Sequence, residues 1–578
     1  MVVSRMIFTR IHFLSHLCCI GWALSSSAQT VELWRTDQLL ESFDSIQKAV
    51  DVALAGDRIQ LREGVYHESV YIDGKHADPA NPIVLEGTPG ERVVLDDADP
   101  GLQISENGRW QWDEGDDAWI ATVPWSGRDS RSLLSWASYD DGRLIASHHN
   151  EEKFKEGARG DALWRTGEHV HLRLLDKVDP NTLSLNIGRS EAIIYFNDSS
   201  GWVIRNLTLR HAGFAGVYLN GKGVSDIELE HLTIEDSFRG ISSEDYGAGG
   251  PSSRIQISDC RILNRWDFSW AWKEGYRDAE SPSSDEAAPV RGSGIHLRAR
   301  DSKILRCEVA GQWDGMQLQG TNLTIQRNLI HHIKDDMIEL ESNNSKNVRV
   351  FENIGFNLFS GLSVVANRGG PVYIYRNFIQ TNMLSRMYDD VWRYGYPLKF
   401  GNDWGPGAEH IYIYQNTFDS LGRSMFVARR SNPQKWRNIE WVNNIFSRGD
   451  DGPVGIEGMG APDQGLHWEG NLFTKKEEMD RLRAYDAAYS TAGILGQPGF
   501  VSPNRYPPDP SIREDSDVVG AGSLRAIESG WPDSIESDST TAPEIGAIPF
   551  GMAVFKAGTS QPPFLPWNEC DEASTAAP

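Results

Sequence analysis

The chain is short of positive charge. Its 578 residues include 56 Lys and Arg against 81 Asp and Glu, which gives a formal net charge of −25. Binding to the phosphates of a nucleic acid requires a basic surface, so this balance argues against a nucleic-acid partner. It also mildly disfavours polyanionic glycans, unless a basic groove forms locally.

Long apolar runs are almost absent. One run, FLSHLCCIGWAL, follows basic Arg5 and Arg10 and is followed by Ser26-Ser27-Ala28. This pattern is typical of a secretory signal peptide over residues 1–28, cleaved near Ala28. No later run is long enough to span a bilayer. We therefore expect a secreted or periplasmic protein without a membrane span.

What the chain does contain is a repeat between about residues 201 and 473. In segments such as LTIQRNLI, VRVFENIG, VYIYRNFI and IYIYQNTF, apolar residues lie five and three places before one fixed position. That position is occupied in turn by Leu207, Leu232, Cys260, Cys307, Asn328, Asn353, Asn377, Asn416, Asn444 and Asn471. The spacing is near 25 residues, with two longer gaps before Cys307 and Asn416. Alternating apolar residues at this period predict about three short strands per repeat.

Stacked repeats place equivalent positions directly above one another, about 4.8 Å apart. The six asparagines would then bond to each other and to the bent backbone, since an unpaired buried amide is costly. We interpret them as a structural ladder rather than a catalytic group. Cys260 and Cys307 share the column, where parallel side chains suit a disulfide poorly, so we expect buried free thiols.

This coil resembles the right-handed parallel β-helix superfamily of pectate lyases, polygalacturonases and related polysaccharide-active enzymes. The resemblance implies an all-β fold: a right-handed parallel β-helix with an N-terminal capping helix and an inserted small β-sandwich. The segment FDSIQKAVDVALAG predicts the helix, with Asp44 or Ser45 as N-cap and Gly56 as terminator. The insertion, from YDDGRLI to LLDKVDPNTL, resembles the small domain inserted in β-helical β-xylosidases.

The expected organisation has six parts. They are a signal peptide (1–28), an N-terminal cap with the first rungs (29–99), the inserted domain (100–190), the β-helix core (191–474), a C-terminal cap segment (475–555) and a frayed tail (556–578). The two long gaps hold loop insertions at 264–291 and 384–396, which both enter before the same strand of their rungs. We expect them to form the walls of a groove, with Trp270 and Trp392 available to stack on sugar rings.

The strand after each ladder position carries a polar residue that alternation turns outward. The expected outward column is Tyr218, Ser242, His296, Gln317, Glu339, Ser363, Lys399 and Val427. Arg298, Glu341 and Arg429 lie two residues further along their strands, and Asp314 and Asp336 lie in the turns before theirs. Charged groups of both signs are concentrated here, so we expect the active site on this face.

Paired carboxylates on adjacent rungs point to glycoside hydrolysis. The predicted catalytic residues are Asp314, Asp336, Glu339, His296 and Lys399. The predicted substrate-binding residues are Trp313, Gln317, Arg298, Glu341, Trp270, Trp392 and Arg429. The Asp and Glu are about one rung apart, as in the β-helical β-xylosidases that the chain resembles. Trp313 could form an apolar wall beside Asp314 or stack a sugar. The hydrolase hypothesis needs no cofactor and no metal.

Two alternatives remain open. A polysaccharide lyase needs a base for the C5 proton of a uronate and a cation for its carboxylate. Lys399 or His296 could be that base, with Ca²⁺ held by Asp314, Asp335, Asp336 and Glu341. The second alternative is a non-catalytic glycan-binding protein or adhesin, which predicts a polar face without acids and bases on adjacent rungs.

Overall fold

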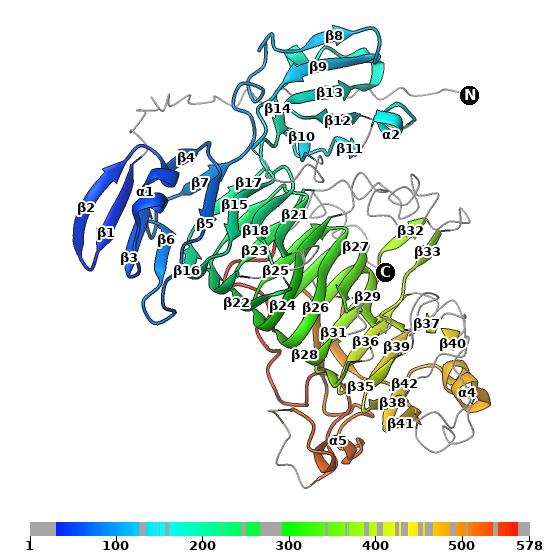
Figure 1. Ribbon diagram of the computed structural model, residues 1–578. Helices are drawn as coiled ribbons and strands as arrows, with labels where there is room; N and C mark the ends of the chain where they lie inside the picture. The colour runs from blue at the N-terminus through cyan, green and yellow to red at the C-terminus, as the bar shows by residue number, and fades with distance from the viewer. Residues whose placement is uncertain are drawn as a thin grey trace, which may run out of the picture.

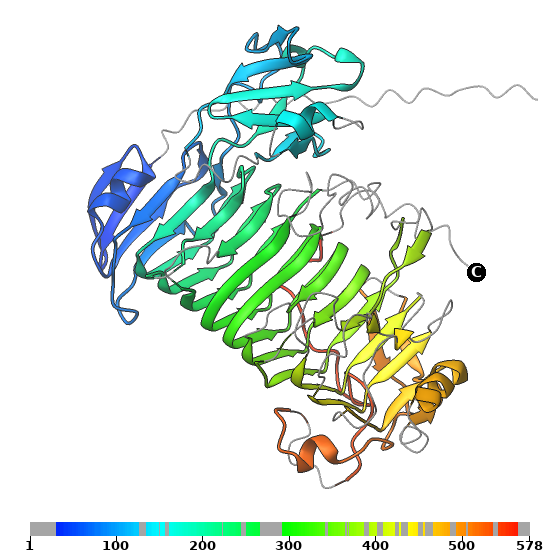
Figure 2. The same ribbon diagram turned by 45° about the vertical axis from the view of Figure 1, so that its right-hand side comes forward.

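The computed structural model describes residues 30–564 apart from 127–134, 149–150, 157–160, 222, 244–249, 266–291, 341–344, 365–366, 368, 387–391, 401–407, 422–426, 429–436, 449–454, 457–465, 486–492, 505–506, 534 and 536–540. Thirty-four of the described strands join one continuous sheet, which Figures 1 and 2 show as an elongated coil of stacked rungs. The all-β parallel β-helix is confirmed. Among the described residues, no helix has the length and apolar character needed to cross a membrane.

The coil has three faces, and strands of successive rungs pair in parallel on each. Face 1 contains β5 (Val70–Asp73), β15 (Ala192–Asn197), β18 (Ala215–Leu219), β21 (Arg239–Ser243), β34 (Leu398–Phe400), β37 (Val427–Ala428) and β40 (Gly455–Ile456). Face 2 contains β3 (Asp57–Leu61), β6 (Ile83–Gly87), β16 (Ser200–Arg205), β19 (Ser225–Glu230), β22 (Ser252–Ser258), β28 (Lys346–Phe351), β30 (Val372–Tyr375), β35 (Glu409–Tyr414), β38 (Arg437–Val442) and β41 (Leu466–Glu469).

Face 3 contains β4 (Gly64–Tyr66), β7 (Val93–Asp96), β17 (Thr208–Arg210), β20 (Thr233–Glu235), β23 (Arg261–Leu263), β25 (Glu308–Gln312), β31 (Phe378–Thr381), β36 (Thr417–Ser420), β39 (Ile445–Arg448), β42 (Asn471–Phe473) and β43 (Gly493–Leu495). Four long strands turn a corner: β24 (Ser293–Leu305) and β26 (Asp314–Gln326) pass from face 1 to face 2, and β27 (Leu329–Glu339) and β29 (Ile354–Val364) pass from face 3 to face 1.

The asparagine ladder is present at the corner between faces 2 and 3. The side-chain amide of Asn353 donates to the Asn377 oxygen at 2.9 Å, and that of Asn377 donates to Asn416 at 2.9 Å. The residue before each ladder position has a left-handed backbone, for example Arg376 with φ 52° and Gln415 with φ 54°. This conformation bends the chain and turns backbone amides away from the sheets. The stacked amides satisfy those groups, which explains why the polar column is buried.

The first four ladder positions are apolar, as predicted. Leu207, Leu232, Cys260 and Cys307 are buried in the main core. Both cysteines are free thiols, and burial beside Cys307 raises the pKa of Cys260 well above its usual range. The expectation of buried thiols is therefore confirmed.

The N-terminal end differs from the sequence-based expectation. A helix, α1 (Ile46–Val52), is present and buries Ile46, Ala49 and Val50, but it ends before Gly56. Two further strands, β1 (Val31–Arg35) and β2 (Gln38–Phe43), add to the sheet in antiparallel fashion, with β1 pairing to β3. This hairpin, which no sequence pattern predicted, occupies the open edge of the first rung.

The inserted segment leaves the coil after β7 and returns at β15. It contains β8 (Gln111–Asp113), β9 (Ala118–Thr122), β10 (Ala137–Tyr139), β11 (Ala146–His148), α2 (Glu151–Glu156), β12 (Ala162–Thr166), β13 (His169–Arg173), η1 (Leu175–Lys177), η2 (Pro180–Thr182) and β14 (Leu185–Ile187). The strands form a five-stranded sheet and a two-stranded sheet that share a hydrophobic core separate from that of the coil. Figure 2 shows this domain beside the N-terminal half of the coil.

Three segments leave the coil at one corner, between faces 3 and 1. They are the inserted domain after β7, the segment between β23 and β24, and the segment between β31 and β34. The last contains a short hairpin of β32 (Leu384–Arg386) and β33 (Trp392–Tyr394). The prediction that both loop insertions enter before the same strand is confirmed, whereas most of the first insertion lies outside the described residues.

The C-terminal segment runs back along the coil. It includes α4 (Lys476–Tyr485), the hairpin of β44 (Phe500–Ser502) and β45 (Asp509–Ile512), and α5 (Arg525–Glu528). Val554, Phe555 and Ala557 pack against apolar residues of face 3, and the Gly558 amide donates to the Arg327 carbonyl at 2.8 Å. The prediction of a frayed tail is therefore wrong for residues 556–564, because this part packs on face 3.

Candidate active site on face 1

The outward column of face 1 has the predicted register. Tyr218, Ser242, His296, Gln317, Glu339, Ser363, Lys399 and Val427 are successive partners across the paired strands. Rungs are spaced about 4.8 Å apart, so neighbouring members of the column are within reach of one another. This register brings the predicted catalytic side chains together.

Three carboxylates form the centre of the site. Asp314, Asp336 and Glu339 each offer one oxygen, and these three oxygens lie within 4.8 Å of one another. Asp314 and Asp336 are buried, whereas Glu339 is partly exposed. Asp314 and Asp336 lie in strands β26 and β27 rather than in the predicted turns. The Asp336 amide donates to Asp314 Oδ1 at 3.2 Å, which holds the two rungs against each other. Such proximity raises the electrostatic cost of ionising all three groups.

A glycine permits this close approach. A Cβ atom at Gly315 would lie 2.4 Å from the Met337 carbonyl oxygen on the next rung, far inside van der Waals contact. Only glycine allows the two backbones to pass at this distance. Because Gly315 directly follows Asp314, Asp314 lies directly beside the rung that carries Asp336.

Lys399 lies on the opposite side of the carboxylates from His296. Its Nζ atom is 2.5 Å from Asp336 Oδ2, and the Asp336 side chain is 3% exposed. A buried carboxylate paired at this distance is stabilised in its charged form. The ammonium of Lys399 therefore compensates the charge of Asp336.

His296 and Gln317 form the other side of the site. His296 Nδ1 lies 2.9 Å from Gln317 Oε1, and Gln317 Nε2 donates to Glu339 Oε2 at 2.5 Å. Burial, reinforced by the guanidinium groups of Arg239 and Arg298, lowers the pKa of His296 well below its usual range. His296 is therefore neutral near pH 7.

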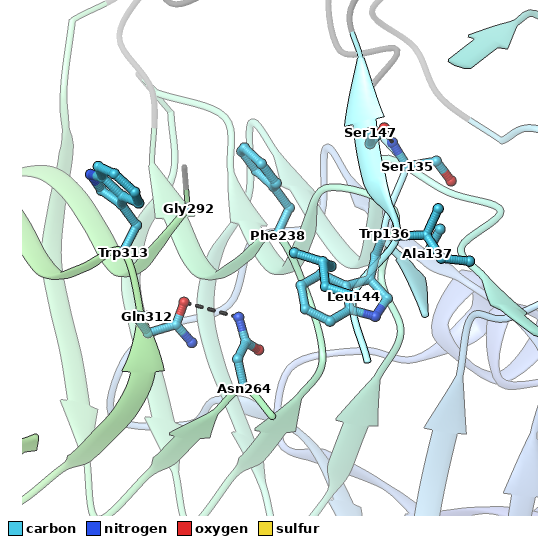
Figure 3. Close-up of a pocket in the computed structure, with 11 residues that line it drawn as sticks. Ser135, Trp136, Ala137, Leu144, Ser147, Phe238, Asn264, Gly292, Gln312 and Trp313 are labelled. Atoms are coloured by element: carbon cyan, nitrogen blue, oxygen red, sulfur yellow. Dashed lines mark hydrogen bonds between the residues drawn. The ribbon is translucent and has the colours of Figure 1, made fainter. Parts of the chain in front are cut away.

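Of the two roles predicted for Trp313, stacking on a sugar does not fit the structure. Trp313 is 1% exposed, and its indole nitrogen donates to Asp335 Oδ2 at 3.2 Å. Figure 3 shows it among the residues that line a cavity between the coil and the inserted domain, which contributes Trp136 and Leu144. The cavity has a volume of about 20 Å³, close to that of one water molecule. Trp313 packs at this interface and is too buried to stack on a sugar.

The residues fit a bound cation less well than the lyase alternative requires. Of the predicted ligand set of Asp314, Asp335, Asp336 and Glu341, the first and third lie in the described cluster of carboxylates, whereas Asp335 accepts from the Trp313 indole. Three carboxylate oxygens would suit a hard cation such as Ca²⁺. However, the Lys399 ammonium already binds Asp336.

The remaining predicted residues are distributed as follows. Arg298 is partly exposed on β24 and pairs in register with Gln319. Glu341, Trp270 and Arg429 lie outside the described residues, as does the side chain of Trp392. The predicted groove walls are therefore not described.

Sequence reasoning missed two residues that contribute to the site. Ser293 Oγ donates to Gln317 Oε1 at 2.7 Å, and Arg239, in β21, acts on His296 electrostatically. Ser293 is the strand partner of Asp314, so the alignment of SGIHL with DGMQL was a signal that could have identified it.

Comparison with known proteins supports the fold. A family model described as a right-handed beta helix region matches residues 192–379. None of the curated proteins matches this chain in sequence. Among solved structures, the complex of XylC with xylose has a TM-score of 0.53 at 15% identity, covering 89% of this chain and 96% of that chain.

Two other solved structures are less similar. Pectate lyase Pel9A has a TM-score of 0.44 at 13% identity, covering 88% of this chain and 91% of that chain. The A-module of the Azotobacter vinelandii mannuronan C-5 epimerase AlgE4 has a TM-score of 0.36 at 10% identity, covering 75% and 87%. With the parallel strand pairing and the likeness to XylC, the match over residues 192–379 identifies the fold of this chain as the right-handed parallel β-helix.

Proposed function

We propose that this protein is a secreted carbohydrate-active enzyme that hydrolyses a glycosidic bond of a polysaccharide or oligosaccharide. The observation that carries the proposal is the group of three carboxylate oxygens within 4.8 Å of one another on face 1. Carboxyl groups about 5 Å apart are typical of retaining glycosidases, whereas inverting enzymes leave a wider gap for water. The proposed reaction therefore retains the configuration of the anomeric carbon.

The proposed working pair is Asp314 and Glu339. Lys399 Nζ binds Asp336 Oδ2, so the charge of Asp336 is compensated and its attack on a sugar is disfavoured. Two carboxylates as close as those of Asp314 and Glu339 favour a state in which they share one proton. Such a pair supplies both the acid and the nucleophile that glycoside hydrolysis needs.

The surroundings distinguish the two roles. Asp314 Oδ1 accepts a backbone N–H, which favours the carboxylate form, so Asp314 is the proposed nucleophile. Glu339 is the partly exposed member of the group, and the proposed acid must reach first the leaving group and then water. Glu339 is therefore the proposed acid and base.

The reaction then proceeds in two steps. Asp314 attacks the anomeric carbon while Glu339 protonates the glycosidic oxygen, so that the C–O bond breaks, the alcohol leaves and a glycosyl ester forms. Glu339, now a carboxylate, removes a proton from water, whose oxygen attacks the same carbon and releases Asp314.

A panel of neutral and uronate polysaccharides tests this function. Hydrolysis predicts new reducing ends without the ultraviolet absorbance of an unsaturated sugar. New reducing ends that appear together with this absorbance would indicate a lyase instead. Absence of any cleavage, with retention of a glycan on the protein, would favour the binding-protein alternative.

The lyase remains the second candidate because His296 is neutral. Burial lowers the pKa of His296 and so keeps the ring neutral. One ring nitrogen then has a lone pair that can accept a proton, as elimination from a uronate requires, but the same lowering makes it a weaker base. Lys399 is a poorer base because it is held as an ammonium by Asp336. A calcium-dependent lyase would lose activity in a chelator, whereas the proposed hydrolase keeps its full activity there.

A further inference from the structure

A chain of hydrogen bonds leads from β24 through β26 to Glu339. Gln317 Oε1 lies 2.7 Å from Ser293 Oγ and 2.9 Å from His296 Nδ1. On the other side of the same amide, Gln317 Nε2 lies 2.5 Å from Glu339 Oε2. Both ends of the Gln317 amide are therefore engaged by the protein.

The chemistry of these partners allows one orientation of the amide. Glu339 as a carboxylate can only accept, so it must face the NH₂ end of Gln317. The oxygen end then faces Ser293 and His296, which both must donate. A reversed amide would set two oxygens against each other at 2.5 Å. His296 consequently carries its proton on Nδ1, because a neutral ring has only one N–H.

The same contact distinguishes the two oxygens of Glu339. Oε2 accepts the N–H of Gln317, and a carbonyl-type oxygen accepts a hydrogen bond better than a hydroxyl does. When Glu339 is protonated, its proton is therefore favoured on Oε1. We propose that Gln317, held by Ser293 and His296, is a positioning residue that keeps the acid proton of Glu339 on Oε1, directed at the glycosidic oxygen. This inference rests on the proposed function and replaces the predicted role of Gln317 in binding substrate.

Leaving-group dependence tests the proposal. A glycoside with a dinitrophenyl leaving group needs no proton donor to depart, whereas one with an alkyl or sugar leaving group does. The variant Gln317→Leu is expected to lose roughly tenfold or more in kcat/KM on an alkyl or sugar glycoside. On the dinitrophenyl glycoside of the same sugar, we expect a change of less than about threefold.

Gln326→Leu is the matched control. Gln326 lies on the same strand and donates to Glu352 on the next rung at 2.9 Å, but it is on face 2, where its strand partner is Phe351. Its ratio of activities on the two substrates should equal that of the native protein. Ser293→Ala, which removes one hydrogen bond to Gln317, should change the ratio in the same direction as Gln317→Leu but less.

Two results would overturn the inference. One is an equal loss on both substrates by folded Gln317→Leu and Ser293→Ala, which would indicate a general structural role. The other is an unchanged activity on both. If Gln317→Leu does not fold, the inference is tested by the ratio of kcat/KM values of Ser293→Ala on the two glycosides. Failure of the proposed function is distinguishable, because the native protein would then cleave neither glycoside.

Discussion

At the scale of single residues, the described part of the site brings the Lys399 ammonium together with three carboxylates. We pair Lys399 with Asp336 and assign the chemistry to Asp314 and Glu339. Asp314→Asn and Glu339→Gln should each lower kcat by roughly 100-fold to 10,000-fold, because each removes a group that forms or breaks a bond. Steady-state kinetics will measure this loss of kcat, on whichever substrate the panel of polysaccharides identifies.

Asp301→Asn serves as the control for those variants. Asp301 is an exposed acid of the corner-turning strand β24 that accepts from Asn322, so its substitution should leave kcat unchanged. Full activity in both Asp314→Asn and Glu339→Gln would show that the site has been assigned to the wrong carboxylates.

The sequence predicted which residues meet but not how they meet. Strict alternation places Asp336 and Glu339, three residues apart, on opposite sides of a strand, yet both oxygens reach Asp314. β27 turns the corner between faces 3 and 1 here, with a register shift between Ile333 and Asp336, and no sequence pattern marks that corner. Trp313 lines a cavity together with Trp136 and Leu144, which are remote in sequence and could not be aligned with the repeat.

One buried histidine predicts a pH dependence of stability. His331 contacts Glu308 at 3.2 Å, and burial lowers the pKa of His331 from 6.5 to about 4. The unfolded chain therefore binds a proton between these values while the folded chain does not. The free energy of unfolding should fall by on the order of 3 kcal/mol as the pH decreases from 6.5 to 4 through this residue.

Urea unfolding across that pH range measures the effect. His331→Gln should reduce the loss of stability on acidification, leaving the dependence due to other groups such as His296. His410→Gln replaces an exposed histidine and should keep the dependence of the native protein. If the free energy of unfolding changes equally with pH in all three proteins, the assignment to His331 is contradicted.

At the scale of elements, the ladder was the best predicted feature because the same environment recurs on each rung. Each rung adds one bend and one inward position, so a repeat in sequence becomes a column in space. The β1 and β2 hairpin was missed for the converse reason. It occurs once, and most of the β2 side chains are exposed, so neither repetition nor alternation marks it.

The ladder predicts a large cost for Asn377→Ala. The Asn377 amide donates to Asn416, Val350 and Tyr375, and its oxygen accepts from Asn353. Removing it leaves several buried polar groups unsatisfied, each costing about 1–3 kcal/mol. We expect a loss of about 3 kcal/mol or more in the free energy of unfolding, measured from the urea midpoint.

Asn220→Ala provides the comparison. Asn220 makes one side-chain hydrogen bond, to Asn197 at 2.8 Å, and is partly exposed. Its substitution should cost about 1 kcal/mol or less. Equal costs at the two positions would indicate that the ladder contributes no more than an ordinary surface hydrogen bond.

At the scale of the whole molecule, the C-terminal segment connects distant rungs. Phe555 and its neighbours cover Leu329, Ile354 and Phe378 on face 3, and Arg261 donates to the Pro562 carbonyl at 3.1 Å. Truncation after Phe550 exposes this apolar surface and should lower the free energy of unfolding by about 3 kcal/mol or more. A urea midpoint equal to that of the full chain would contradict this packing role.

The inserted domain and both loop insertions leave the coil at the same corner, beside face 1. A solenoid tolerates such insertions because each rung depends mainly on its neighbours. The sequence predicted where they enter, because each interrupts the repeat, but the contact of Trp136 with the coil required the three-dimensional arrangement. The proposed site thus lies on face 1, and the inserted domain and both loop insertions leave the coil beside that face.

The stereochemistry of hydrolysis tests the central claim most directly. Proton NMR of the first-formed product, recorded before mutarotation, reports the configuration of the new reducing end. The close carboxylates on face 1 predict the same anomeric configuration as in the substrate. An inverted product, or a sugar containing a carbon–carbon double bond, would contradict the account.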